Sequence, residues 1–328
     1  MKKIEFNVGL FNESFPPLMD GVAVCVQNYA YWMQKKVGGV EVVTPRVTGA
    51  DYSQYDYSVH AFLSVPVPGR RPYVAGVPEM SPSFLEHGLK THYKIVHAHS
   101  PFLCGMTAMR IARRLGVPLV ATFHSKYWSD AYQYTHSTLA ADLMAKWVVN
   151  FYNTCDAVWA CSEGTAETLR SYGYQGDITI MTNGTNFKAP LNPDELREWA
   201  QREFRLPQGK HTLLFVGHQI WQKNLKLVLD TFRLLCDESD DYRLVIVGKG
   251  IAENEVKDYA ASLGLSDRTV FTGGISDRDL LSGVFLNADL FFFPGRFNAE
   301  GQYESNTYVM SPRKPYIEAV VGVHNIFK

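Results

Sequence analysis

The stretch VGHQIWQKNLKLVLDTF, residues 216–232, decides the fold. An apolar run, Leu213 to Val216, ends at Gly217, as a buried strand does where it passes into a loop. Beyond the loop, Lys223 opens a segment with the apolar spacing of an amphipathic helix. A strand, a polar loop and a helix in this order predict one unit of a parallel α/β sheet. The loop is either an ordinary connection with a solvated lysine or a place where an anion binds at a helix start.

The same alternation of apolar strands and amphipathic helices runs along most of the chain. Strands are expected at 4–11, 40–45, 94–100, 117–124, 157–162, 178–184, 212–217, 242–250, 269–274 and 289–295, and helices at 22–36, 102–116, 163–173, 223–237, 251–265 and 277–288. Strands that are apolar on both faces, such as 244–247, are typical of parallel sheets covered by helices. We therefore predict two doubly wound domains. We expect a junction in residues 185–210 and an irregular loop with one short strand over 50–85.

Composition narrows the class of protein. The chain has 328 residues, a net charge of −1, 46% hydrophobic residues and 20% charged residues, so no overall charge favours binding to nucleic acid. Its five cysteines are scattered without a CxxC spacing, which favours buried thiols in a reducing cytoplasm. The first residues, MKKIEFNVGLFNES, read as a strand rather than a signal peptide, because Glu5 and Asn7 interrupt the apolar run. No apolar stretch approaches the roughly 20 residues of a membrane span.

Polar residues follow several strands of the first half, where open α/β sheets bind ligands. Gly21 stands before the first helix and permits close approach of a ligand to the backbone, although a turn glycine explains it equally well. His97 and His99 are two residues apart, so their side chains lie on the same side of a strand. The pair suits a metal ion, but the sequence shows no third ligand nearby.

His124 follows the strand at 117–124 and is the candidate acid–base group, because an imidazole accepts or donates a proton near neutral pH. The residues after it offer an aromatic and polar floor for a sugar or a lipid headgroup: Lys126, Tyr127, Trp128 and Tyr132. A histidine held by backbone hydrogen bonds is the alternative.

Two loops of the second half suit phosphate. Lys223 at a helix start would add a point charge to the partial positive charge of the helix end, which suits a diphosphate. Gly248 and Gly250 follow a buried strand and let a ligand lie against the backbone. No GxGxxG follows the first strand, so the dinucleotide-binding fingerprint is absent.

Taken together, these segments resemble a retaining glycosyltransferase of family 4. The resemblance is carried by FNESFPPLMDGVAVCVQN, IVHAHSPF, GVPLVATFHS, VWACSEGTAETLRSYG, MTNGTNF, FVGHQIWQKNLKLVLDTF, RLVIVGKG and VFTGGISDRDLLSGVFLNADLFFFP, in this order. It runs to about Pro294, roughly nine-tenths of the chain. It implies an α/β GT-B fold: two Rossmann-like doubly wound domains facing across a cleft. The acceptor-side domain would span 1–188, and the nucleotide-sugar domain would span 189–328.

The resemblance also implies roles for single residues. His124 matches the active-site histidine that handles the acceptor, and His99 is a further candidate site residue. The residues expected to contact the donor are Gly21, His218, Lys223, Gly248, Gly250 and Ile275. For the loop at 216–232, the resemblance favours the bound anion, here the diphosphate of a nucleotide sugar. Such a site is expected to need no metal and no cofactor.

The sequence departs from the family pattern at two places. His218 and Gln219 stand where the family usually has an arginine after the strand glycine. After 289–294 the family has two glutamates eight positions apart. Here Glu300 is followed eight residues later by Tyr308, and Glu318 is preceded by Met310 at the same interval. We therefore expect an incomplete second domain and weak catalysis, with Glu300 and Glu318 as remaining candidates.

The predicted function is transfer of a hexose from a UDP or GDP sugar to an acceptor hydroxyl with retention. The acceptor would be a glycan or a lipid such as diacylglycerol. A catalytically impaired nucleotide-sugar-binding protein and an epimerase of the same architecture are the alternatives, and TNGTNF and KNL favour the transferase over the epimerase. The protein is expected in the cytoplasm. A further expectation is peripheral contact with the inner face of the membrane.

That contact would use basic and aromatic residues of the first half. Arg110, Arg113 and Arg114 share one helix face, and the aromatic residues are Trp128, Tyr132 and Trp147. A solvated helix face is the alternative explanation of the arginines.

Overall fold

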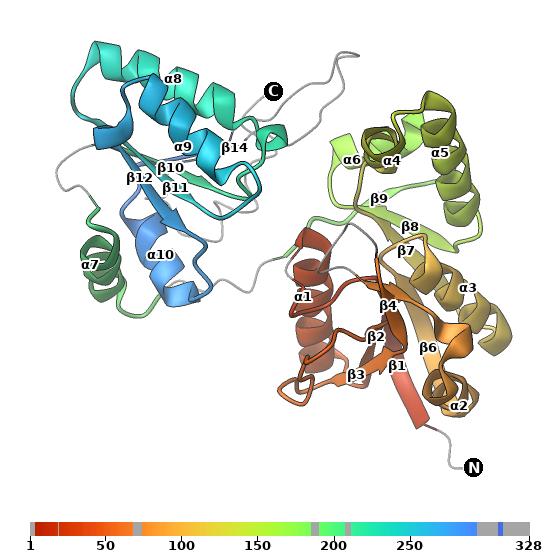
Figure 1. Cartoon of the computed structure of the whole chain (residues 1–328). Helices are drawn as coiled ribbons and strands as arrows, with labels where there is room; N and C mark the ends of the chain where they lie inside the picture. Colours follow the sequence, from red (N-terminus) through yellow and green to blue (C-terminus); the bar gives the residue numbers. More distant parts are fainter. Residues whose placement is uncertain are drawn as a thin grey trace. The chain divides into compact units, whose positions relative to one another are not determined.

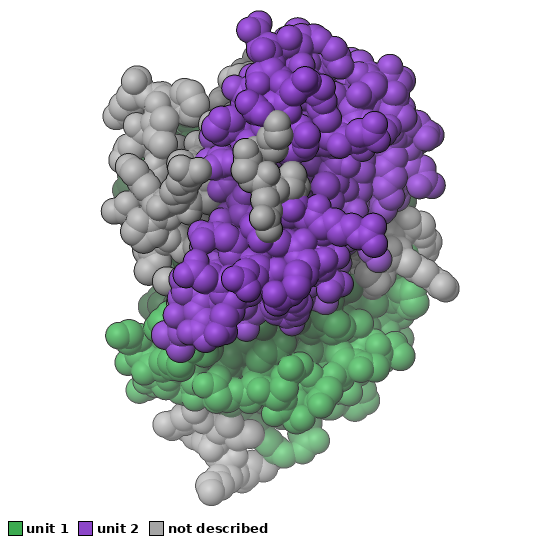
Figure 2. Space-filling view, turned by 90° about the vertical axis from the view of Figure 1, so that its left-hand side faces the viewer, with its two compact units in different colours: residues 1–185 green, residues 186–328 purple. Residues whose placement is uncertain are grey.

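The computed structural model describes residues 4–18, 20–67, 74–184, 190–206, 211–293 and 308–310. The chain divides into two compact units, residues 1–185 and 186–328, which are coloured separately in Figure 2. The first unit is built on a parallel sheet in the order β3-β2-β1-β6-β7-β8-β9, and the second on a smaller sheet in the order β12-β11-β10-β13-β14 (Figure 1). Both confirm the predicted α/β class with parallel sheets.

The elements of the first unit alternate between strand and helix. They are β1 (Ile4–Phe11), α1 (Gly21–Lys36), β2 (Val40–Pro45), β3 (Ser58–Phe62), α2 (Pro82–Lys90), β6 (Thr91–Ala98), α3 (Leu103–Leu115), β7 (Leu119–Phe123), α4 (Tyr127–Thr135), α5 (Thr138–Tyr152), β8 (Ala157–Ala160), α6 (Glu163–Ser171) and β9 (Thr179–Ile180). A small antiparallel pair, β4 (Ser64–Pro66) and β5 (Val74–Gly76), and a 3₁₀ turn, η1 (Pro78–Met80), precede α2.

Helices cover both faces of this sheet because successive strand residues point to opposite sides. In β1, Leu10 packs on the α1 side with Val26 and Ala30, whereas Phe11 packs on the side of α3 and α5 with Ala108 and Val148. Helix α3 ends at Gly116. This residue has a left-handed backbone (φ +67°), and its N–H donates to Ala112 O and Arg113 O, which caps the last turn.

The second unit repeats the same layering. Its elements are α7 (Pro193–Phe204), β10 (His211–Val216), η2 (Trp221–Lys223), α8 (Leu225–Glu238), β11 (Tyr242–Val247), α9 (Glu253–Ser262), η3 (Ser266–Arg268), β12 (Thr269–Gly273), α10 (Arg278–Leu286), β13 (Leu290–Phe293) and β14 (Tyr308–Met310). Helices α8 and α9 lie on one face of the sheet, and α7 and α10 on the other (Figure 1). Strand β14 pairs antiparallel with β13, while the other strand pairs are parallel.

The strand order places a topological switch point in each sheet. In the first unit the chain winds outward from β1 in one direction to β2 and β3, and in the other to β6, β7 and β8. In the second unit it winds from β10 to β11 and β12 on one side and to β13 on the other. Ligands of open α/β sheets bind at the carboxyl ends of the strands at such points. The loops after β1, β6, β10 and β13 are therefore the places to examine.

Several local expectations were wrong. Residues 50–85 are not one irregular loop, because β3 extends the parallel sheet beside β2 and α2 precedes β6. The two units divide at 185/186, within the expected junction at 185–210, but that stretch also contains α7, which packs so closely on α10 that a Cβ at Gly283 would lie 2.1 Å from Leu196 O. Helices α4 and α5 were not predicted, and the strand expected at 178–184 has only two residues, β9. Short strands and charged helices carry weak periodic signals, and tertiary packing determines them.

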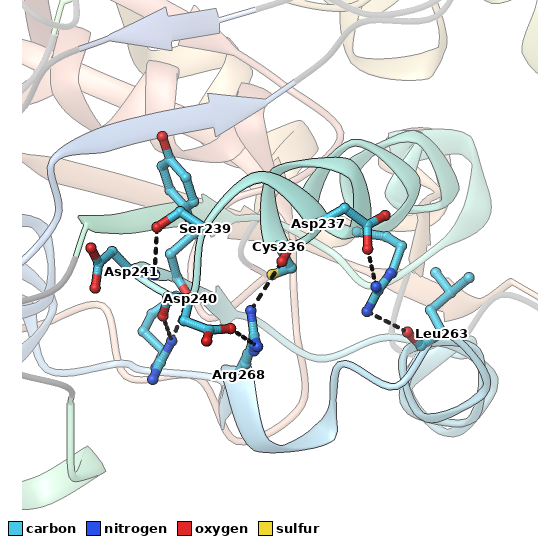
Figure 3. Close-up of polar contacts among 10 residues, drawn as sticks. Cys236, Asp237, Ser239, Asp240, Asp241, Leu263 and Arg268 are labelled. Atoms are coloured by element: carbon cyan, nitrogen blue, oxygen red, sulfur yellow. Dashed lines mark hydrogen bonds and ion pairs between the residues drawn. The ribbon is translucent and has the colours of Figure 1, made fainter.

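Figure 3 shows why the paired aspartates after α8 are structural. Asp240 forms an ion pair with Arg268, which also donates to Cys236 O at 3.3 Å. Asp241 N donates to Ser239 Oγ at 3.1 Å. Asp241 O also accepts from His211 N at 2.8 Å. These contacts join the end of α8 to η3 and to the start of β10.

Among the described residues, no helix combines the length and the apolar composition that a bilayer crossing demands.

Candidate functional site

Three histidines gather at the carboxyl ends of β6 and β7 in the first unit. His99 Nδ1 lies 3.1 Å from His124 Nε2, and the rings of His97 and His99 are 4.0 Å apart between centroids. His97 Nε2 lies 2.8 Å from Thr122 Oγ1, which fixes that ring. The structure therefore brings His99 and His124, both expected in the site, into direct contact. Their functional roles stay predictions.

Burial keeps these imidazoles neutral. Loss of water lowers the pKa of His97 to about 3, with the nearby His124 as a second cause, and lowers the pKa of His124 to about 4. Burial also lowers the pKa of His99 well below its usual value, reinforced by the two other histidines. A neutral imidazole donates from one nitrogen and accepts at the other. The cluster thus offers hydrogen bonds rather than charge.

Helix α1 and its N-cap bring three further residues to this end of the first sheet. Asp20 caps the helix by accepting from Ala23 N at 2.7 Å, and the exposed Gly21 begins it. Nothing lies within 4 Å of a Cβ built on Gly21, so a ligand has room there. One turn later, Cys25 Sγ and one ring nitrogen each of His99 and His124 lie within 4.8 Å of one another. Sequence reasoning missed Cys25; its only signal was its place one turn after the loop glycine.

A buried carboxylate in the loop after β1 was also missed. Glu13 accepts from Cys104 N at 2.6 Å and from Ser100 Oγ at 3.3 Å. It thereby holds the first turn of α3, where free N–H groups favour negative charge. Burial raises the pKa of Glu13, and these hydrogen bonds oppose that rise.

In the second unit, Lys223 is the central residue, but not at the expected place. It ends the 3₁₀ turn η2, and α8 begins only at Leu225 after Asn224 adopts a left-handed backbone (φ +58°). The ammonium of Lys223 lies 5.6 Å from the ring centroid of Phe293, the last residue of β13. It therefore stands beside the switch point between β10 and β13.

The Lys223 ammonium has no anionic partner in the described part of the chain. Neither a hydrogen bond nor an ion pair joins it to another described residue, although the side chain is partly buried. Burial accordingly lowers the pKa of Lys223. A partly desolvated cation without a partner costs free energy that a bound anion would recover.

The two loops after β10 and β11 are joined tightly beside Lys223. Gln219 N donates to Lys249 O at 3.0 Å, and Gln219 Nε2 donates to Gly248 O at 2.7 Å. Gly248 has φ +133°, and a Cβ there would lie 1.9 Å from Gly217 O. A Cβ at Gly250 would lie 2.2 Å from Gln219 O. Both glycines are thus required by the close approach of the two loops.

The remaining expected donor residues differ in their surroundings. His218 is exposed beside this pair of loops, whereas its neighbour Gln219 is fully buried and its Oε1 lacks a hydrogen-bond partner within the described ranges. Ile275 is half-buried and packs against the core on the α7 and α10 side. Glu300 and Glu318 lie outside the described residues.

Comparisons with known proteins agree with this arrangement. The family described as Glycosyltransferase Family 4 matches residues 19–188, and the family Glycosyl transferases group 1 matches residues 197–302. The chain is 25% identical to the alpha-monoglucosyldiacylglycerol synthase of Streptococcus pneumoniae, over 96% of this chain and 73% of that protein. It is also 25% identical to the GDP-mannose-dependent alpha-mannosyltransferase of Corynebacterium glutamicum, over 88% of this chain and 67% of that protein.

Solved structures show the same fold. Sucrose-phosphate synthase from Thermosynechococcus elongatus superposes with a TM-score of 0.69 at 17% identity, covering 89% of this chain and 76% of that one. Anabaena HepE in complex with UDP-glucose superposes with a TM-score of 0.62 at 16% identity, covering 90% and 76%. Two Rossmann-like units with these loops define a GT-B glycosyltransferase, and the chain belongs to glycosyltransferase family 4. It is a hexosyltransferase that depends on a nucleotide sugar.

We predict that Gly248→Ala lowers nucleotide affinity at least about tenfold, or about 1.4 kcal/mol. The new methyl group has no room against Gly217 O, so the two loops must separate and their N–H groups must move. Calorimetric titration with UDP and GDP measures the effect. Gly264→Ala is the matched control, because Gly264 has φ +69° but open space around its Cβ. Equal losses in both variants would show that backbone strain alone matters.

Proposed function

We propose that this protein transfers a hexose from a UDP or GDP sugar to a lipid hydroxyl, such as that of diacylglycerol, with retention of the anomeric configuration. The observation that carries the proposal is the partly buried ammonium of Lys223, which has no anionic partner among the described residues and lies in the loop after β10 that is joined to the loop after β11. A diphosphate is an anion of the right size and charge for such a cation next to exposed loop backbone. The names of the relatives that act on diacylglycerol and on GDP-mannose support the two substrate classes.

In the proposed step, the bond between the anomeric carbon and the diphosphate oxygen breaks, and a bond from that carbon to the acceptor oxygen forms on the same face. The proton of the acceptor hydroxyl leaves with the diphosphate. Lys223 offsets the charge that develops on the leaving group, which is the largest electrostatic demand of the reaction. His124, neutral and in contact with His99, orients the acceptor hydroxyl by a hydrogen bond.

A lipid acceptor requires contact with a membrane, and α5 offers a better surface for it than the arginines of α3. Arg110 pairs with Glu79, and Arg114 donates to Gly88 O, so both have partners on their own unit. On α5, by contrast, three apolar residues one turn apart are exposed: Leu139 by 69%, Leu143 by 58% and Trp147 by 36%.

This apolar α5 stripe continues onto neighbouring aromatic groups. Trp147 stacks on Phe102 at 5.4 Å between centroids, and Tyr132 and Tyr134 of α4 are exposed. Aromatic residues beside leucines suit the interface of a bilayer. Helix α4 begins three residues after His124. The stripe therefore belongs to the pair of helices, α4 and α5, that directly follows the residue proposed to orient the acceptor. We propose that the apolar α5 stripe contacts the inner face of the plasma membrane and that the protein resides in the cytoplasm.

Lys223→Ala should weaken binding of UDP or GDP by roughly 1.5–3 kcal/mol, the range for a hydrogen bond to a charged group. The fold should be kept, since the side chain stabilises no described ion pair. Calorimetric titration measures the affinity. Lys226→Ala is the control, because that exposed lysine pairs with Asp230 on the helix surface. Unchanged affinity in a folded Lys223→Ala protein would contradict the assignment of the diphosphate.

His124→Ala should leave nucleotide affinity intact and lower the transfer rate about 10²-fold, as for a lost acid–base or positioning group. His124→Asn, which keeps a donor and an acceptor on a short side chain, should recover part of the rate. Glycolipid formation is followed by chromatography of the lipid fraction. A transfer rate in His124→Ala equal to that of the wild type would make this residue purely structural.

The double substitution Leu139→Asp/Leu143→Asp should lower binding to anionic phospholipid vesicles at least about tenfold, because each leucine buried in lipid contributes about 1.5–3 kcal/mol when fully covered. Co-sedimentation with vesicles measures the bound fraction. Leu234→Asp is the control, since Leu234 is 67% exposed on α8 of the other unit. The proposed docking face is wrong if the double variant binds like the control.

A further inference from the structure

A thiol and two imidazoles from three different elements meet at the end of the first sheet. Cys25 comes from α1, His99 follows β6, and His124 follows β7. One potential ligand atom of each residue lies within 4.8 Å of the others. Within the described part of the chain, this is the group of histidine, cysteine and acidic side chains that comes together closely enough to hold a metal ion.

A second observation concerns the hydrogen bonding of this group. His99 is 1% exposed, and its Nε2 has no hydrogen-bond partner among the described residues. A buried polar nitrogen without a partner is costly, and such atoms call for an unseen group. Cys25 is 4% exposed, and its Sγ donates a hydrogen bond to Asn183 Oδ1 at 3.1 Å. The triad therefore has coordinating capacity that the protein itself leaves unused.

We propose that Cys25, His99 and His124 bind a divalent cation of the zinc class. One thiolate and two imidazoles are a ligand set that zinc accepts, with a fourth position left for water or a substrate oxygen. Ligand atoms around a tetrahedral zinc lie about 3.3–3.7 Å apart, given bonds of about 2.0–2.3 Å. The three potential ligand atoms already lie within 4.8 Å of one another, and metal binding would draw them together to that spacing.

Binding changes the protonation of the site in a defined way. The cation takes the place of the Cys25 proton, which is released to solvent, and both imidazoles bind it in their neutral form. Asn183 then turns its amide so that the NH₂ group, instead of the oxygen, faces the thiolate.

The consequence for transfer rests on the proposed function. A cation on His124 occupies the nitrogen that would orient the acceptor hydroxyl, so zinc acts as an inhibitor rather than as a cofactor. The nucleotide site on the second unit contains none of the three ligands, and nucleotide affinity should not change. A zinc-dependent loss of transfer without loss of nucleotide binding is the expected signature.

The test uses the full chain, freed of metal and reduced, with Co²⁺ and Zn²⁺ as probes. Co²⁺ should produce a thiolate-to-cobalt charge-transfer band that saturates at one equivalent, and competition with a chromophoric chelator gives the zinc affinity. Cys25→Ser should abolish the band and weaken zinc binding at least tenfold, and His99→Gln should weaken it likewise. Cys155→Ser is the matched control, because this half-buried thiol of the same unit donates to Phe151 O at 3.5 Å and lies outside the triad.

The proposal is overturned if the wild-type protein shows no such band. It is equally overturned if Cys25→Ser retains the band or if Cys155→Ser loses it. These are spectroscopic readouts on folded protein, so they judge the metal site even if no transfer activity is found. An active enzyme that shows the band but is not inhibited by zinc would retain the site and remove its role in regulation.

Discussion

The carbonyl oxygen of Gly217 lies where the Cβ of a side chain at position 248 would have to stand, and the arrangement of the two strand-end loops of the second unit depends on this contact. Only a glycine with φ +133° lets the loop after β11 approach the loop after β10 so closely. Gln219 then joins the two loops with its backbone and side-chain amides. The two loops are therefore held together by backbone and amide hydrogen bonds, in the part of the second unit that also contains Lys223.

Both units hold partly or fully buried polar groups at the ends of their strands. Lys223 is charged, partly buried and without a described partner, while three histidines are held neutral by burial in the first unit. Such groups lower stability in the absence of a ligand, and the rest of each core offsets that cost. The second unit thus presents a cation at its strand ends, and the first presents neutral hydrogen-bonding groups.

The strand-end positions of the candidate site could be predicted from the sequence, because glycines and polar residues after buried strands have a clear local meaning. Lys223, Gly248 and His124 were found in this way. Cys25 and Glu13 could not be, since their role arises when α1 and the loop after β1 fold back onto His99 and α3. The same holds for the fold: strong strands such as β11 were recognisable, whereas β3, α4 and α7 depend on packing that no local pattern records. Gln219, which stands with His218 where the family usually has an arginine, has a structural role in joining the loops, and nothing in the sequence alone indicated this role.

The central claim is that this chain forms a glycosidic bond to a lipid with retention. The most direct measurement is nuclear magnetic resonance of the anomeric proton of the product, formed from UDP-glucose or GDP-mannose and diacylglycerol in vesicles. From an α-configured donor we predict an α-linked glycolipid, and the same signal should vanish with the Lys223→Ala protein. A β-linked product, or nucleotide binding without any glycolipid from either donor, would contradict the account.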